Sequence, residues 1–197
     1  VLNTQSDDVV MGSLPLFHVF GFTVTQLLPL IEGLPLVCHA NPADAPGIAG
    51  AVAKHKATLL FSMSSFLSMF VSNSAVHPMM LESLRVVVAG AEKLDEDARI
   101  RFELKFHKPV YEGYGATEVA PVASVNLPDA LGVNYQQVQR GSKPGTVGMP
   151  LPGTSFKIVK PDSFEELPTG EAGMVLISGP QIMQGYLNEP QRTAQAI

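Results

Sequence analysis

The sequence of 197 residues contains one cysteine, Cys38, and so forms no internal disulfide bond. A single thiol fits a reducing compartment, and we expect a cytoplasmic protein. Cys38 closes the apolar run 34–38, where a small buried side chain is a more common role than a nucleophile. We therefore predict that Cys38 is a core residue.

Long apolar runs and blocks of basic residues are also missing. No stretch reaches 18 consecutive apolar residues, so the sequence predicts no membrane-spanning helix. The 13 lysines and arginines are outnumbered by 18 acidic residues, and the net charge is −5. This balance, without a dense basic segment, argues against nucleic acid as a partner.

Both ends of the sequence have the character of cuts. The chain begins Val-Leu-Asn-Thr without a methionine and stops at Ile197, inside a segment with a helical pattern. Hydrophobic residues make up 46% and charged residues 16%, which suits a chain whose apolar faces meet other parts of a protein. We expect an internal piece of a longer protein. If that protein associates with the inner face of a membrane, we expect it to do so only through parts outside this sequence.

Strand-like and helix-like segments alternate over the first 120 residues. The expected strands are 9–11, 34–38, 58–61, 84–89 and 110–112, and the expected helices are 20–31, 48–55, 65–71 and 95–107. Strands separated by helices imply crossover connections, so we predict an α/β fold with a mostly parallel sheet and flanking helices. Ligands of such sheets bind beyond the carboxyl ends of the strands.

The pattern changes after Pro121. Residues 126–153 are rich in glycine and proline, and the runs 155–159 and 173–177 that follow have the alternation of antiparallel strands. We predict an α/β subdomain over residues 1–125 and a small antiparallel, barrel-like β subdomain over residues 126–197.

The densest candidate for chemistry is the segment 111–118, Tyr-Glu-Gly-Tyr-Gly-Ala-Thr-Glu. Its two glycines permit close backbone approach, and Tyr114 between them offers a flat aromatic face. Thr117 supplies a hydroxyl for a phosphate oxygen, and Glu118 supplies a hard carboxylate suited to Mg²⁺. These groups fit a nucleotide, although a glycine-rich turn with a surface glutamate explains the octapeptide about equally well.

Two weaker signals precede this segment. The strand at 84–89 ends in small residues, which suits a planar ligand but suits tight packing of strand and helix even better. His18 stands between aromatic residues, where a core histidine with satisfied hydrogen bonds is more common than a ligand-binding one. The remaining histidines lack metal-ligand spacing, and neither a serine-hydrolase elbow nor a Walker lysine loop is present.

Five blocks, taken in order and spacing, carry a family resemblance. They are "PLFHVFG", "VVAGAEKL", "EGYGATE", "KPGTVGMPLPG" and "SGPQIMQGYLNEPQRT". Together they resemble the AMP-forming, adenylate-forming superfamily of acyl- and aryl-CoA synthetases, luciferases and nonribosomal adenylation domains. Within it, "VVAGAEKL", "EGYGATEVAPVASVN" and "KPGTVG" look most like the fatty acyl-ACP synthetase domain of bacterial 2-acylglycerophosphoethanolamine acyltransferases.

The resemblance implies a site for ATP and its product AMP. Tyr114 would stack on the adenine, Thr117 would bind the α-phosphate, and Glu118 would hold Mg²⁺. Both Thr117 and Glu118 would be catalytic residues, together with His18. The remaining walls around the nucleotide would come from Gly90, Ala91, Glu92, Glu112, Gly113 and Gly115.

The resemblance also implies an acyl site and a two-step reaction. His18 would lie at the mouth of the acyl pocket, Gly21 would help to open it, and Ala116 would lie beside the reacting carboxylate. The carboxylate of a fatty acid would attack the α-phosphorus of ATP and release pyrophosphate. The acyl group would then pass to the thiol of CoA or of acyl carrier protein, with catalysis by positioning and charge neutralisation.

Some family features lie outside the sequence or depart from the pattern. The phosphate loop with its lysine, the ribose-binding aspartate and the lid with its catalytic lysine are absent, so we expect this piece alone to be inactive. Ser62, Met63 and Ser64 replace a proline that is common in the family, which puts one wall of the acyl pocket in doubt.

Two alternatives stay open. An aryl or amino acid could replace the fatty acid, but the apolar stretches 17–25 and 61–70 carry no charged residue to meet an amino group. The second alternative is a nucleotide- or acyl-binding module without catalysis.

Overall fold

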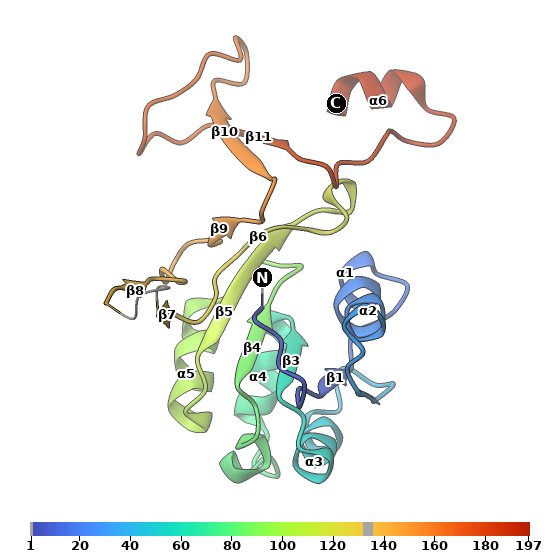
Figure 1. The fold of residues 1–197 in the computed structure, drawn as a ribbon, viewed down its shortest axis with the longest axis vertical. Coiled ribbons are helices and arrows are strands. Elements are labelled where there is room, and N and C mark those ends of the chain that lie inside the picture. Colours follow the sequence, from blue (N-terminus) through green and yellow to red (C-terminus); the bar gives the residue numbers. More distant parts are fainter. Residues whose placement is uncertain (1, 132–135) are drawn as a thin grey trace.

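A seven-stranded sheet in the order β2-β1-β3-β4-β5-β6-β9 forms the centre of the molecule (Figure 1). The computed structural model describes residues 2–131 and 136–197. The strands of this sheet are β1 (Val10–Gly12), β2 (Leu36–Cys38), β3 (Leu59–Ser62), β4 (Val86–Ala89), β5 (Val110–Gly115), β6 (Val122–Val125) and β9 (Met149–Pro150). The first five run parallel, and β6 and β9 are added antiparallel. The predicted α/β fold with a mostly parallel sheet is confirmed.

Helices cover both faces of the sheet. The segment α1 (Val19–Phe22), η1 (Thr23–Leu27) and α2 (Leu28–Glu32) runs without a break, and the other main helices are α3 (Ala45–His55), α4 (Ser64–Ser72) and α5 (Glu96–Phe106). Successive strand residues point to opposite faces. Met11 and Leu60 therefore pack with the core that includes α3, α4 and α5, whereas Val10 and Leu59 pack with Phe20 of α1.

Local signals in the sequence fix the ends of these helices. The side chain of Asp44 accepts a hydrogen bond from the N–H of Gly47 (3.0 Å) at the start of α3. Asp95 does the same for the N–H of Ala98 (2.8 Å) at the start of α5, which is the usual role of an aspartate at this position. Gly33 ends α2 in the left-handed conformation with φ 70°, which a residue without Cβ adopts at little cost.

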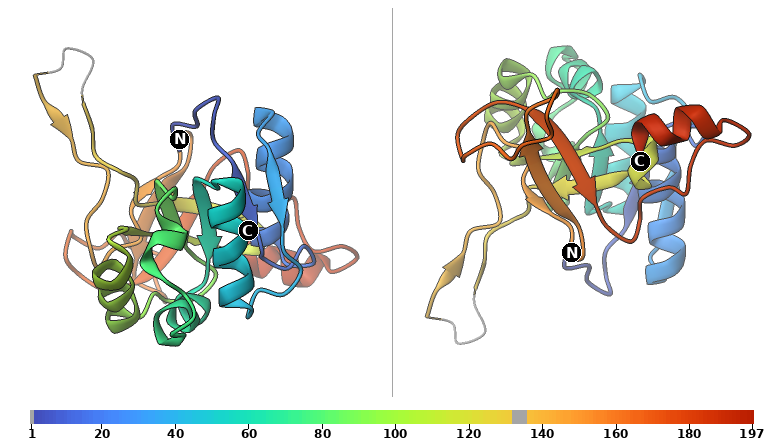
Figure 2. Two further views of the ribbon diagram at one scale, coloured as in Figure 1. Left: turned by 90° about the horizontal axis from the view of Figure 1, so that it is seen from below. Right: turned by 90° about the horizontal axis from the view of Figure 1, so that it is seen from above.

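The C-terminal third carries the smaller elements. The strands β10 (Ser155–Val159) and β11 (Met174–Ser178) pair antiparallel, where the sequence predicts two alternating strands. A second antiparallel pair joins β7 (Ala130–Leu131) to β8 (Val138–Gln139), and α6 (Pro190–Ala196) follows. Seen from above, β10, β11 and α6 lie over the end of the sheet at which the parallel strands stop (Figure 2). The predicted division between residues 125 and 126 stays a prediction, and residues 132–135 lie outside the described part.

One prediction about the core is wrong. Cys38 is exposed, because β2 is the edge strand of the sheet and, among the described strands, pairs with β1 alone. Apolar neighbours in the sequence do not reveal which strand lies at an edge. Among the helices of residues 2–131 and 136–197, none has the length and apolar character that crossing a bilayer requires.

Candidate functional site

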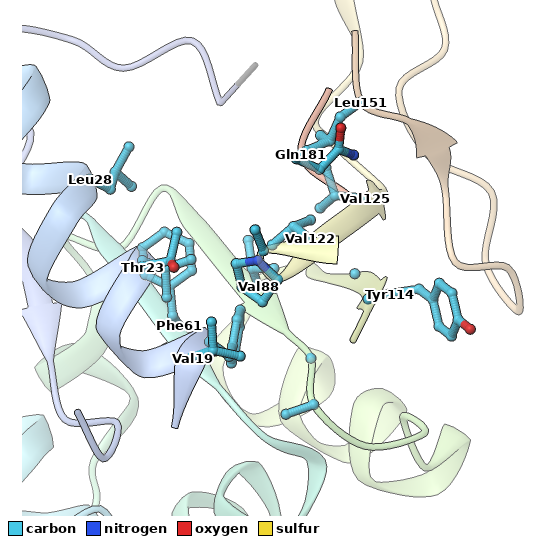
Figure 3. Close-up of a pocket in the computed structure, with 18 of the residues that line it drawn as sticks. Val19, Thr23, Leu28, Phe61, Val88, Tyr114, Val122, Val125, Leu151 and Gln181 are labelled. Atoms are coloured by element: carbon cyan, nitrogen blue, oxygen red, sulfur yellow. The ribbon is translucent and has the colours of Figure 1, made fainter. Parts of the chain in front are cut away.

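A cavity of about 790 Å³ lies at the carboxyl ends of the parallel strands (Figure 3). The connections that follow β1, β4 and β5 all reach it, through His18, Gly90 and Ala116 respectively. This is the edge of a parallel sheet at which ligands bind. The volume falls within the range of about 300–1,000 Å³ that small-molecule sites occupy.

Apolar side chains form the inner part of the cavity. In Figure 3 the helical side presents Val19 and Leu28, and Val122 and Val125 of β6 lie across from them. Phe61 and Val88 close the base from β3 and β4, with Phe61 held edge-to-face against Phe20 at a centroid distance of 6.5 Å. These walls suit an aliphatic or aromatic group, and the acidic residue Glu32 of α2 lines the cavity on the same helical side.

The helical wall contains a π-helical turn that the sequence does not reveal. Residues Thr23–Leu27 form this turn between α1 and α2, and Thr23 and Val24 line the cavity. The buried hydroxyl of Thr25 donates to the carbonyl oxygen of Gly21 (2.7 Å). π-Helical turns are rare in proteins, but those that occur often lie at functional sites.

Two glycines allow close packing around the cavity. At Gly21 an added Cβ would overlap the carbonyl oxygen of Pro15, and at Gly90 it would meet the Phe20 ring at 3.1 Å. Gly90 lines the cavity, whereas Gly21 is buried and is not among the lining residues. The predicted role of Gly21 in opening the pocket therefore stays a prediction.

The rim of the cavity is the glycine-rich end of β5 and the turn that follows it. Tyr114 is 39% exposed, and its ring lies away from the apolar wall in Figure 3 and packs edge-to-face on Phe156 of β10 at a centroid distance of 6.3 Å. The β5–β6 pairing shifts register between Tyr114 and Gly115. At Gly115 an added Cβ would overlap the carbonyl oxygen of Pro121, so this position requires glycine for packing. Next along the rim, Thr117 is exposed.

Glu118 is held by residues from the far end of the chain. The Tyr186 hydroxyl donates to Glu118 Oε1 at 2.6 Å, and this hydrogen bond holds the pKa of Glu118 below its usual value. The same bond raises the pKa of Tyr186. The N–H of Met183 also donates to the carbonyl oxygen of Glu118 (2.9 Å). Sequence reasoning assigned no role to Tyr186, although it lies within the last of the five family blocks.

Most of the predicted site residues meet at this cavity. Its lining includes His18, Gly90, Ala91, Gly113, Tyr114, Gly115, Ala116, Thr117 and Glu118. His18 is exposed and caps α1, with Nδ1 accepting the N–H of Phe20 (3.2 Å). The alternative of a buried core histidine is therefore wrong. A neutral His18 carries its proton on Nε2, because Nδ1 acts as the acceptor.

Two further predicted residues, Glu92 and Glu112, do not line the cavity. The carboxylate of Glu92 accepts the N–H of Ser65 (2.6 Å), and that of Glu112 accepts the N–H of Leu94 (3.2 Å). Both carboxylates thus tie loops together near the site. Their predicted contacts with a nucleotide stay predictions.

The residues present fit Mg²⁺ that is shared with a ligand. Within the described ranges, no group of three or more His, Cys, Asp or Glu side chains forms a metal cluster. Glu118 does supply a carboxylate at the rim of the cavity. Mg²⁺ is commonly held by one or two carboxylates together with substrate phosphates, so a single carboxylate suits it only if the ligand brings phosphate.

A parallel sheet with an apolar cavity and a glycine-rich rim at its carboxyl edge defines an α/β ligand-binding domain. A family model described as AMP-binding enzyme matches residues 1–187. The chain belongs to this family.

Known relatives support the same placement. The chain is 31% identical over 190 residues to a long-chain-fatty-acid–CoA ligase of Salmonella typhimurium, covering 96% of this chain and 32% of the relative. It is 32% identical over 197 residues to 4-coumarate–CoA ligase 2 of Solanum tuberosum, covering 100% and 35%. The crystal structure of apo MatB from Rhodopseudomonas palustris superposes with a TM-score of 0.82 at 26% identity, covering 96% and 35%. The chain thus spans about a third of the length of these curated relatives.

Proposed function

We propose that the protein is an AMP-forming acid–thiol ligase that activates a fatty acid through an acyl-adenylate. The observation that carries the proposal is the apolar cavity that opens beside Thr117 and Glu118. An acid whose tail fills the apolar part would bring its carboxylate to a rim that offers a hydroxyl and a carboxylate. Membership of the AMP-binding enzyme family supports ATP as the second substrate.

The rim residues have distinct roles in this proposal. The exposed face of Tyr114 stacks on the adenine, and Gly90, Ala91 and Gly113 offer backbone without bulky side chains. Thr117 donates to the α-phosphate, and Glu118 is the protein's ligand for Mg²⁺. The metal ion, when bound, neutralises charge on the phosphates. The chain therefore contributes positioning and electrostatic stabilisation.

The acid end of the site uses the loop after β1. His18 stands at the mouth of the cavity with Nε2 as a donor for the carboxylate, and Ala116 leaves room beside it. Positioning the carboxylate near the α-phosphorus makes the attack effectively unimolecular. The carboxylate displaces pyrophosphate to form the acyl-adenylate, and the thiol of CoA or acyl carrier protein then takes the acyl group as AMP leaves. The curated relatives that are CoA ligases favour CoA.

An aryl acid is the second candidate substrate, because a 4-coumarate–CoA ligase is as similar to the chain as the fatty-acid ligase is. The full-length protein should therefore be tested for ATP–pyrophosphate exchange with aliphatic acids of several lengths, 4-coumarate and an amino acid. We expect exchange with the aliphatic acids and none with the amino acid, because the inner wall of the cavity is formed by apolar side chains such as Val19, Leu28 and Val122. Exchange with 4-coumarate but with none of the aliphatic acids would show that the substrate is an aryl acid and not a fatty acid.

Residues 1–197 alone serve as the control in that experiment. The resemblance puts the phosphate-loop lysine, the ribose-binding aspartate and the lid outside this sequence, so we expect the piece to show no exchange. Turnover by the piece would contradict that expectation. Absence of exchange by the full-length protein with every acid would favour a binding module without catalysis.

A further inference from the structure

The segment 183–193 is docked on the turn that carries Glu118. Tyr186 donates its hydroxyl to Glu118 Oε1 (2.6 Å), and the N–H of Met183 donates to the carbonyl oxygen of the same residue (2.9 Å). The side chain and the backbone of Glu118 are therefore both held by one distant segment.

Tyr186 is itself fixed from two sides. The guanidinium carbon of Arg192 lies 4.4 Å from the centroid of the Tyr186 ring, which is cation–π geometry. The N–H of Tyr186 donates to Thr193 Oγ1 (2.9 Å), and that hydroxyl donates to the carbonyl oxygen of Glu189 (2.9 Å). Because both the ring and the backbone N–H of Tyr186 are held, its hydroxyl is kept in one position.

We infer that Tyr186 is a positioning residue that orients the Glu118 carboxylate for a divalent cation bound with ATP. The inference rests on the proposed function, in which Glu118 is the metal ligand. An ionised carboxylate offers about four lone-pair sites, so a hydroxyl bound to Oε1 leaves capacity for a cation. Hydrogen bonds to a ligating carboxylate fix its orientation and are a regular part of metal sites.

The competing explanation is a contact that only fastens the C-terminal segment. Such a contact would affect stability, or the binding of every ligand equally. A positioning contact affects the metal ion selectively, because it acts through the carboxylate alone. Metal affinity measured separately from nucleotide affinity therefore distinguishes the two explanations.

The test uses the full-length protein and the variants Tyr186→Phe, Glu118→Gln, their combination, and Tyr111→Phe as the matched control. Tyr111→Phe removes the same hydroxyl from a tyrosine that lies on β5 and packs against an apolar cluster. Mn²⁺ binding is followed by electron paramagnetic resonance with α,β-methylene-ATP present. Binding of that analogue without metal is followed by calorimetry.

We expect Tyr186→Phe to weaken Mn²⁺ binding about 10-fold, the lower end for loss of an outer-shell partner. Metal-free binding of the analogue should be unchanged, and Tyr111→Phe should leave both affinities unchanged. In the Glu118→Gln background, Tyr186→Phe should cause no further loss, because the two residues act through one carboxylate.

Unchanged or tighter Mn²⁺ binding in Tyr186→Phe would overturn the inference, and so would an equal loss of metal-free nucleotide binding. If Glu118→Gln weakens Mn²⁺ binding while Tyr186→Phe does not, only the positioning role fails. If Glu118→Gln is also without effect, the metal assignment in the proposed function fails with it.

Discussion

At the scale of single residues, the rim of the cavity brings together the groups that the proposed nucleotide site requires. Tyr114 keeps an exposed aromatic face although Phe156 packs on its edge. Glu118 keeps a carboxylate whose pKa is lowered by the hydroxyl of Tyr186. Tyr114 lies near the end of β5 and Glu118 lies in the turn that follows, and in the proposed function they serve different parts of the nucleotide, so each can be removed separately.

Tyr114→Ala and Glu118→Ala should each lower ATP–pyrophosphate exchange of the full-length protein by about 100-fold or more, the scale of losing one group that stabilises developing charge or orients a substrate. Leu104→Ala is a suitable control, because Leu104 is exposed on α5 and is not among the residues lining the cavity. Exchange at the wild-type rate in both rim variants would rule out the assigned nucleotide site.

At the scale of elements, the sequence predicts the parallel sheet well and the cavity walls only in part. Short β-branched runs between caps such as Asp44 and Asp95 mark the strands and helices, because these signals are local. The π-turn at Thr23–Leu27 and strand β6 have no such signal. β6 is defined by pairing with β5 across an irregular register, which only the folded chain shows.

The same distinction explains which site residues could be found. The glycine-rich end of β5 and the turn after it reach the cavity because the carboxyl ends of neighbouring parallel strands lie side by side. The hydrogen bonds of Glu92 and Glu112 join residues 27 and 18 positions apart, and Tyr186 lies 68 positions from Glu118. No pattern in the sequence connects residues at such separations.

Two glycines in helices offer a matched comparison of packing. Gly21→Ala should lower the free energy of unfolding by about 1–3 kcal/mol, since its Cβ would overlap the carbonyl oxygen of Pro15. Gly50→Ala in α3 should raise it by about 0.5–1 kcal/mol, because its Cβ meets no atom within 4 Å and alanine favours a helix. Urea denaturation of the full-length protein measures both changes. An unchanged free energy of unfolding in Gly21→Ala would show that the backbone around Pro15 can move to admit the Cβ.

At the scale of the whole molecule, the carboxyl and amino ends of the parallel strands carry different features. The cavity lies at the carboxyl ends of the strands, whereas an ion pair between the buried Asp8, which precedes β1, and the partly exposed Arg85, which precedes β4, lies at their amino ends. Arg85 Nε donates to Asp8 Oδ1 (2.7 Å), and the hydroxyl of Thr58 donates to the same oxygen (2.6 Å). The three residues join the starts of β1, β3 and β4.

This network should make stability depend on acid pH. Burial raises the pKa of Asp8, but hydrogen bonds from Arg85, Thr58 and the N–H of Gln5 outweigh burial and lower it from 3.8 to about 2. The stabilisation, about 2 kcal/mol, is therefore complete above about pH 4 and is lost as the pH falls through about 2.

Urea denaturation of wild type and Asp8→Asn at several pH values isolates this contribution, because the other carboxylates titrate in both. The difference in unfolding free energy between the two proteins should shrink as the pH falls from 5 towards 2. A constant difference would mean that Asp8 is not the group responsible.

The contact between Tyr186 and Glu118 also has a thermodynamic consequence, because coupling between two sites is reciprocal. If docking of the segment 183–193 improves cation binding at Glu118 by some factor, then a bound cation must favour docking by the same factor. Amide hydrogens of that segment, such as the Met183 N–H that donates to Glu118, would then exchange more slowly when metal and nucleotide are present. Filling the site would order the C-terminal end of the chain.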